Sequence, residues 1–181
     1  MREKALIRPL EENDLPAVGH ILADTWRSTF RGLLPDSYLD GLSASHQSQR
    51  VSRLLRQGGS ACFVAVTPES EVAAYAGGGL NRGPEPAVTF ELYAIYVNRE
   101  HQGLGIGRRL FHAVAQALTA KASGSLIVWA LTINPCRSFY ERLGGRNIAT
   151  GMTELGGTSF EMVGYFWKDL RTAVTGEPNT A

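Results

Sequence analysis

The stretch that decides the fold is residues 91–110, Glu91-Leu-Tyr-Ala-Ile-Tyr-Val-Asn-Arg-Glu-His-Gln-Gly-Leu-Gly-Ile-Gly-Arg-Arg-Leu110. An apolar run ends at Val97, a short polar turn follows, and Gly103, Gly105 and Gly107 open a segment with helical periodicity. Backbone N–H groups are free at the start of a helix, the helix dipole favours an anion there, and glycine lets a phosphate approach the backbone closely. The stretch therefore predicts a strand, a phosphate-binding turn and a helix.

Two common phosphate-binding motifs do not fit this turn. A Walker loop needs Lys and then Ser or Thr after its last glycine, whereas Gly107 is followed by Arg108 and Arg109. A dinucleotide-binding fingerprint counted from Gly103 needs a glycine at position 108 and an acidic residue on the next strand. That next strand reads Leu126-Ile-Val, so both alternatives fail.

The rest of the chain predicts one α+β domain with a mixed, mostly antiparallel central sheet flanked by helices. The run from Leu126 to Leu131 is apolar throughout, as in a strand buried on both faces, and completes a right-handed βαβ unit with the stretch before it. We expect further strands near residues 5–9, 62–66, 71–79, 87–97, 146–150 and 160–167. We expect helices near residues 14–29, 35–42, 46–55, 103–120 and 135–143. The domain is predicted over residues 1–171, with a loose, polar tail over 172–181.

Composition narrows the function classes. The 181 residues are 44% hydrophobic and 19% charged with a net charge of +1, and no block of like charge indicates a nucleic acid or membrane surface. Cys62 and Cys136 lie far apart and form no metal or redox motif, so we interpret them as free thiols of a reducing compartment. The N-terminus lacks the apolar core of a signal peptide, and no apolar run approaches the roughly 20 residues of a membrane span. We expect a cytoplasmic protein.

Two motifs together resemble the GNAT superfamily of N-acetyltransferases. The first is Gln102-Gly-Leu-Gly-Ile-Gly107, and the second is the segment 129–145, in which a strand, Asn134 and a helix with Phe139-Tyr140 are followed by Gly-Gly. The resemblance extends over most of the chain, from Ile7 to Leu170. It implies a GNAT-like fold in which a bulge splays the strand before the turn from the next, parallel strand.

The resemblance also implies acetyl-CoA as co-substrate and no metal. Pantetheine would lie along the backbone of Ile95, Tyr96 and Val97, whose side chains we interpret as core, and an N–H near Tyr96 or Val97 would stabilise the oxyanion. Arg108 either adds charge to a phosphate or is a solvated surface arginine. The pyrophosphate would accept hydrogen bonds from the backbone amides of Gln102, Gly103, Leu104, Gly105, Ile106 and Gly107.

Two catalytic side chains follow from the same resemblance. Tyr140 would protonate the leaving thiolate, the alternative being that it packs in the core. Asn134 is predicted to be both the N-cap of a helix that begins at Pro135 and a contact of CoA. Glu91 would deprotonate the attacking amine, directly or through water, and its alternative is a structural carboxylate paired with an arginine.

The acceptor would meet the first two helices. Trp26, Phe30 and Tyr38 are candidates for its wall because aromatic faces attract an ammonium, although Trp26 and Phe30 are spaced to face the core together. The sequence thus predicts an enzyme that moves an acetyl group from acetyl-CoA to a primary amine of a small molecule, by direct attack on the thioester. A protein or peptide N-acetyltransferase and a non-catalytic acyl-CoA sensor remain alternatives, and so do a monomer and a homodimer.

Overall fold

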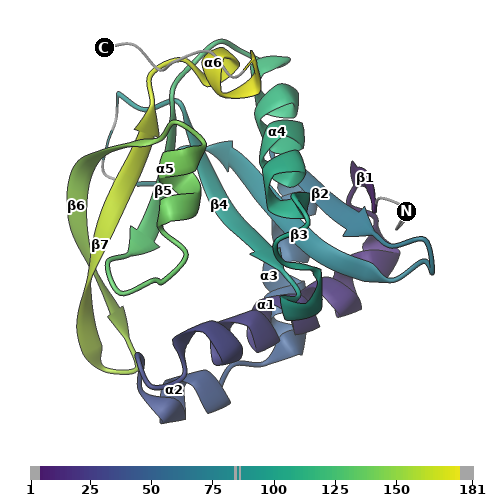
Figure 1. Cartoon of the computed structure of the whole chain (residues 1–181), viewed down its shortest axis with the longest axis vertical. Coiled ribbons are helices and arrows are strands. Elements are labelled where there is room, and N and C mark those ends of the chain that lie inside the picture. Colours follow the sequence, from purple (N-terminus) through teal and green to yellow (C-terminus); the bar gives the residue numbers. More distant parts are fainter. Residues whose placement is uncertain (1–4, 84, 86, 176–181) are drawn as a thin grey trace.

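A seven-stranded sheet forms the centre of the computed structural model, which describes residues 5–83, 85 and 87–175 (Figure 1). The strands are ordered β1-β2-β3-β4-β5-β7-β6, with β4 and β5 parallel and every other pair antiparallel. Their bounds are β1 Leu6–Pro9, β2 Ala61–Val66, β3 Val72–Leu80, β4 Phe90–Val97, β5 Leu126–Leu131, β6 Arg146–Leu155 and β7 Thr158–Trp167. This is the α+β, GNAT-like sheet that the sequence predicted.

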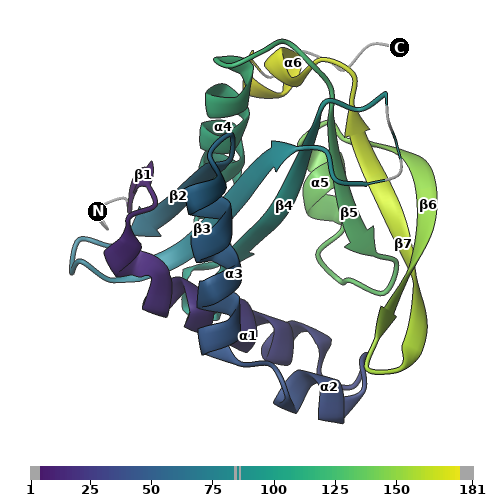
Figure 2. The ribbon, with the colours of Figure 1, turned by 180° about the vertical axis from the view of Figure 1, so that it is seen from behind.

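Helices cover both faces of the sheet. They are α1 Leu15–Phe30, α2 Asp36–Asp40, α3 Ala44–Gln57, α4 Ile106–Thr119, α5 Ser138–Arg142 and α6 Leu170–Thr175, with short 3₁₀ turns η1 Glu12–Asp14 and η2 Arg99–His101. Figure 2 shows α1 and α3 together on one face, and Figure 1 shows α4 and α5 on the other. The described residues contain no helix that is long and apolar enough to cross a membrane.

The two faces carry separate parts of the core. On one face, α4 buries Leu110, Phe111, Val114 and Leu118, which recur at helical spacing, against β2, β3 and β4, and Phe111 also meets Trp167 at the end of β7. On the other face, Val18 and Leu22 of α1 pack against β2 and β3. Strand β4 separates the two clusters, because its side chains alternate between the faces.

The parallel pair separates early. Only Phe90 and Glu91 of β4 pair with β5, at Leu126 and Ile127, so the remainder of β4 has no strand beside it on that edge. A bulge at Tyr93 accompanies the separation: Leu92 pairs with Gly78 and Ala94 with Gly77 of β3, which leaves the residue between them unpaired. The bulge lies two residues before Ile95, where the stretch that the resemblance assigns to pantetheine begins.

Two local expectations need correction. Asn134 is not a helix N-cap, because α5 begins only at Ser138; the Asn134 side chain instead accepts a hydrogen bond from the Cys136 backbone N–H at 2.8 Å and closes a turn. Residue 172 does not begin a loose tail, because α6 continues to Thr175 and its Leu170 is fully buried. Residues 176–181 of the predicted tail lie outside the described residues.

Candidate active site

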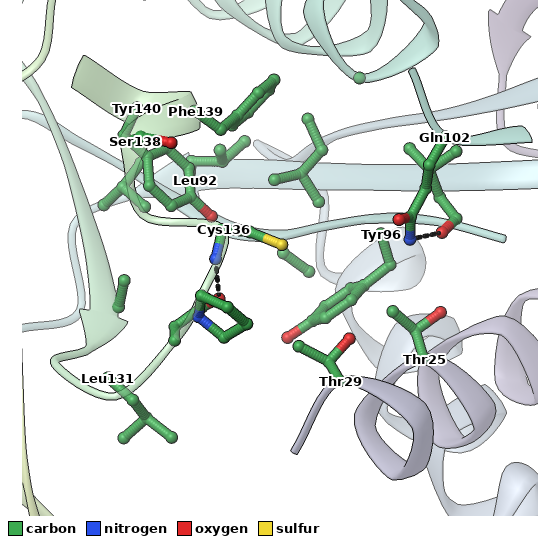
Figure 3. A pocket seen from close by; sticks show the side chains of 18 of the residues that line it. Thr25, Thr29, Leu92, Tyr96, Gln102, Leu131, Cys136, Ser138, Phe139 and Tyr140 are labelled. Carbon is green, nitrogen blue, oxygen red and sulfur yellow. Dashed lines mark hydrogen bonds between the residues drawn. The ribbon is translucent and has the colours of Figure 1, made fainter. Parts of the chain in front are cut away.

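A cavity of about 810 Å³ opens where β4 and β5 separate (Figure 3). Its described lining comes from α1, β4, the turn 101–108, β5, the segment 134–143, β6 and β7. Thirteen of the residues predicted from the sequence are in this lining: Trp26, Phe30, Ile95, Tyr96, Val97, Gln102, Gly103, Gly105, Ile106, Gly107, Arg108, Asn134 and Tyr140. Glu91, Leu104 and Tyr38 are not, and the Leu104 side chain is 57% exposed to solvent.

The glycine turn forms one end of the cavity, the end at which the sequence predicts phosphate binding. Gly103 and Gly105 both have φ of +75°, a left-handed backbone that favours glycine, and Gly105 precedes the first residue of α4. The first backbone hydrogen bond of α4 runs from the Arg109 N–H to the Gly105 carbonyl, at 3.2 Å. The amides of residues 103–108 are therefore available to an anion at the positive end of a 14-residue helix, whereas the Gln102 N–H, also predicted to bind phosphate, donates to the Arg99 carbonyl at 3.3 Å.

Two contacts fix this turn against its neighbours. The Gln102 side chain donates a hydrogen bond to the Val97 carbonyl at 3.0 Å, which ties the turn to the end of β4. At Gly107 an added Cβ would lie 3.3 Å from the Phe139 ring, so the start of α4 closely approaches the segment that carries Tyr140. Arg108 is exposed at the same helix start and contributes a positive charge to the lining.

Tyr140 projects toward the cavity from α5. Its ring packs against Phe139 and Tyr165 at centroid distances of 5.3 and 5.5 Å. No described side chain or backbone group makes a recorded hydrogen bond with its hydroxyl. Burial, chiefly, and then the neighbouring Tyr96, Cys136 and Tyr165 raise the pKa of Tyr140 far above the usual range of a phenol. The hydroxyl is consequently protonated at neutral pH and has its proton available to a group in the cavity.

Tyr96 points from β4 into the same cavity, opposite Tyr140 (Figure 3). The indole N–H of Trp26 donates a hydrogen bond to the Tyr96 hydroxyl oxygen at 2.8 Å. Burial raises the pKa of Tyr96 to about 12, against the opposing effects of the Trp26 hydrogen bond and of Arg50. Because the indole occupies an acceptor position, the Tyr96 O–H is available to donate. The sequence interpretation treated this side chain as core and missed it.

Of the three aromatic residues predicted to line the acceptor pocket, two line the cavity and one does not. Trp26 lies 5.0 Å from Phe30 and 6.1 Å from Tyr38, measured between ring centroids. Trp26 and Phe30 line the cavity, whereas Tyr38 lies behind Trp26 and packs against the β6–β7 turn, where a Cβ on Gly156 would come within 2.8 Å of the Tyr38 Cβ. Tyr38 therefore supports the wall that Trp26 presents.

Glu91 lies beside the cavity and is held by an arginine. Arg82 donates to the Glu91 carboxylate from its backbone N–H at 3.1 Å and from its guanidinium at 3.2 and 3.3 Å. The guanidinium carbon of Arg82 also lies 3.5 Å from the ring centroid of Tyr93, the bulge residue. The Glu91 side chain is 12% exposed. This is the arrangement of the structural alternative for Glu91, namely a carboxylate paired with an arginine.

Sequence reasoning also missed several lining residues, two of them, Trp129 and Cys136, within the second motif. Thr25 and Thr29 of α1 lie on the helical face that carries Trp26, so their spacing was a usable signal. Cys136 lines the cavity and is exposed, although the sequence interpretation treated it as a bystander of the chemistry. Other lining residues, Trp129, Thr153 and Met162, come from strands whose register no local pattern fixes. Among the described residues there is no cluster of three or more His, Cys, Asp or Glu side chains that could hold a metal.

Comparison with known proteins agrees with this geometry. Residues 86–153 match the family model described as "FR47-like protein", and these residues include the glycine turn, β5 and Tyr140. A protein of Bacillus subtilis (strain 168) with the name "Uncharacterized N-acetyltransferase YuaI" is 29% identical over 170 residues, which cover 93% of this chain and 96% of that relative.

Solved structures with the same fold include several acetyltransferases. An N-acetyltransferase from Staphylococcus aureus Mu50 superposes with a TM-score of 0.73 at 20% identity, covering 93% of this chain and 99% of the other. A phosphinothricin acetyltransferase from Sinorhizobium meliloti, solved in complex with AcCoA, gives a TM-score of 0.71 at 20% identity over 97% and 94% of the two chains. The PaiA N-acetyltransferase from Thermoplasma acidophilum, in complex with coenzyme A, gives 0.70 at 18% identity over 89% and 98%. At such identities the likeness concerns the fold.

Proposed function

Since the chain belongs to the GNAT superfamily of N-acetyltransferases, we propose that it transfers the acetyl group of acetyl-CoA to a primary amine of a small molecule by direct attack on the thioester. One observation carries the proposal: the free amides at the start of α4 and the hydroxyl of Tyr140 open into one cavity. An anion-binding end and a proton donor within one cavity are what a CoA thioester requires.

The residues present fit acetyl-CoA from end to end. The amides of 103–108 and the Arg108 guanidinium would hold the pyrophosphate. The edge of β4 beyond Glu91 has no β5 partner, so the backbone at Ile95 to Val97 would pair with the amides of pantetheine as an added strand would. Such pairing brings the thioester toward the part of the cavity between Tyr140 and Tyr96.

The reaction that this arrangement supports has two bond changes. The amine nitrogen would form a bond to the thioester carbonyl carbon, and the carbon–sulfur bond would break. The Tyr140 O–H would give its proton to the departing thiolate, and a backbone N–H near Tyr96 or Val97 would stabilise the negative charge on the carbonyl oxygen. The proton lost by the amine nitrogen would pass to water, and water would return a proton to the Tyr140 oxygen, so that the protons balance over one turnover.

Glu91 is assigned a positioning role in this proposal. Its carboxylate is committed to Arg82, and the same guanidinium rests on the ring of the bulge residue Tyr93. The Glu91–Arg82 pair would thus hold the bulge from which β4 and β5 diverge, in place of the base role that the resemblance implied. The amine would lose its proton because an apolar cavity disfavours the charged ammonium.

A small acceptor is favoured over a peptide by the closure of the acceptor end. The turn between β6 and β7 contacts Tyr38 of α2, and Leu155 and Met162 pack in one cluster with Phe30 and Leu131. Figures 1 and 2 both show the tip of this hairpin beside α2. An extended peptide would have to separate these elements, whereas a compact amine would not.

The test is a panel of amines, amino acids, polyamines and peptides, with acetyl-CoA as donor. We expect release of free thiol to depend on a small amine and mass spectrometry to show one added acetyl group. Turnover with peptides alone would favour the protein N-acetyltransferase. Acetyl-CoA binding with only slow hydrolysis and no acetylated acceptor would favour the sensor alternative.

A further inference from the structure

The acceptor end of the cavity has a different chemical character from its cofactor end. Its side chains are the aromatic and aliphatic groups Trp26, Phe30, Trp129, Leu131, Leu155 and Met162. The polar side chains that the same elements add are uncharged hydroxyls, those of Thr25, Thr29 and Thr153. Such a lining binds an apolar body and leaves few partners for a charge.

The basic side chains of the described lining lie at the other end. His101 belongs to η2, Arg108 to the start of α4 and Arg142 to α5. These elements surround the glycine turn, where phosphates would bind. None of the described lining residues is Asp or Glu. A second charge on the acceptor, of either sign, would therefore be desolvated at the acceptor end without a counter-charge.

One hydrogen-bonded pair of polar groups, the Tyr96 hydroxyl and the Trp26 indole, lies where an amine would enter. The Tyr96 hydroxyl oxygen accepts the Trp26 indole N–H at 2.8 Å, and the Trp26 and Phe30 rings line the same cavity with their centroids 5.0 Å apart. Aromatic faces attract an ammonium during entry, and the surrounding apolar surface favours its neutral form once it is bound. Tyr96 is thus a polar partner for one amine group, and the lining residues around it that the structure describes add no charged partner for a second.

We infer that the acceptor is a primary amine with an aromatic or compact apolar body and no second charge. This inference rests on the proposed acetyl transfer and narrows its substrate class. It excludes polyamines, which carry further ammonium groups, and free amino acids, which carry a carboxylate. The substrate would be released as a neutral amide, because acetylation removes its single charge.

The experiment compares amines that differ by one charge. Phenethylamine is matched with phenylalanine, which adds a carboxylate, and hexylamine with 1,6-diaminohexane, which adds an ammonium. We expect kcat/KM to fall by roughly 10²-fold or more on each addition, because an unpaired buried charge costs several factors of ten in binding. Equal or higher kcat/KM for phenylalanine or for the diamine would overturn the inference.

A charge placed in the wall provides the converse test. Thr29→Asp puts a carboxylate in the cavity with little change in shape, and Ser28→Asp adds the same charge on the neighbouring, exposed residue outside the lining. We expect Thr29→Asp to raise the diamine-to-hexylamine ratio of kcat/KM by about tenfold or more, as one paired charge would. Ser28→Asp should leave the ratio unchanged. Identical ratios in all three proteins would overturn the inference.

Calorimetry with acetyl-CoA on the same samples distinguishes failure of the proposed function from failure of the inference about the acceptor. Absence of acetyl-CoA binding would overturn the proposed function and this inference together. Binding of acetyl-CoA with acetylation of charged acceptors only, or of none of the four amines, would overturn this inference while the cofactor assignment stands. Binding together with preference for the singly charged amines would support both.

Discussion

At the scale of single residues, the two tyrosines of the cavity differ in their hydrogen-bond partners. Tyr140 has a raised pKa and an unengaged hydroxyl, whereas the Tyr96 oxygen already accepts the indole N–H of Trp26. A phenol whose pKa is raised remains protonated through neutral pH, so it can give a proton to the thiolate and cannot act as a base there. We propose the acid role for Tyr140 because its hydroxyl lines the cavity without a hydrogen-bond partner among the described residues; the raised pKa does not distinguish the two phenols, since that of Tyr96 is raised as well.

Tyr140→Phe should reduce kcat by roughly 10²-fold or more when chemistry limits the rate, because the ring stays and only the proton donor is lost. Affinity for acetyl-CoA should change little. Tyr165→Phe is the matched control: it removes a hydroxyl from the adjacent ring, which donates to Glu141 at 3.0 Å and does not line the cavity. Steady-state kinetics in which both variants retain the wild-type kcat would remove Tyr140 from the acid role.

Glu91→Gln and Arg82→Met should have similar, moderate effects, a loss of about 2- to 10-fold in kcat/KM, because each breaks the same contact behind the bulge. The double variant should be no worse than either single one, and the pH–rate profile should keep its wild-type shape. A general base would behave differently, since Glu91→Gln alone would then depress turnover most at low pH. That pattern would return Glu91 to the base role.

At the scale of elements, the sequence predicted most strands and helices because each has a strong local pattern. The apolar run of β5 was located to the residue, and the amphipathic pattern of α4 placed the glycine turn correctly at its start. The start of α5 was missed because Asn134 uses its side chain for a turn with Cys136, which competes with helix capping. The bulge at Tyr93 depends on the register with β3, and no local pattern contains that register.

The residues of the cavity could also be predicted only where the pattern that identifies them is local in the sequence. The motif residues around the turn and Tyr140 could be predicted because they lie close together along the chain. The role of the Tyr96 side chain could not, since its partner Trp26 belongs to α1, far away in the sequence. Alternation along β4 was an available signal: Ile95 and Val97 pack with the cluster of α4, so Tyr96 must face the side where α1 lies.

The connection between β1 and α1 gives an element-scale prediction about stability. The Asp14 carboxylate is buried and accepts hydrogen bonds from Arg8 at 2.6 and 2.8 Å and from the Glu11 backbone N–H at 2.9 Å. The hydrogen bonds from Arg8, chiefly, hold the pKa of Asp14 below its usual value. Because the pKa is lowered in the folded state, the stabilisation is present above the unfolded pKa and is lost as the pH falls through the lower, folded value.

Asp14→Asn should therefore lower the free energy of unfolding at pH 7 by about 2–3 kcal/mol, since Arg8 loses its partner at a largely buried site. The difference between variant and wild type should begin to shrink below about pH 4, the pKa of the unfolded state, and should continue to shrink as the pH falls toward the lower pKa of the folded carboxyl. Urea unfolding at several pH values measures this. A destabilisation that is constant down to pH 2 would show that charge at Asp14 contributes nothing.

At the scale of the whole molecule, the cavity connects the two faces of the sheet at the gap between β4 and β5. Helices α4 and α5 cover the face from which CoA would enter, and α1 with α2 covers the face from which the amine would come (Figures 1 and 2). The early separation of β4 from β5 opens the passage between the faces. The lining contributed by α1 can therefore vary in chemistry without disturbing the glycine turn.

The central claim is that the cavity at this gap binds acetyl-CoA through the start of α4, and calorimetric titration of the full chain with acetyl-CoA tests it most directly. Gly107→Glu places bulk and negative charge in the lining, and Leu104→Glu adds the same charge to the exposed part of the same turn. The wild-type protein should bind one equivalent, and Gly107→Glu should weaken binding by about 100-fold or more through the loss of charge-assisted hydrogen bonds. Leu104→Glu should weaken it far less, with melting curves confirming that both variants are folded. Unchanged affinity in a folded Gly107→Glu variant, or no binding by the wild-type protein, would contradict the account.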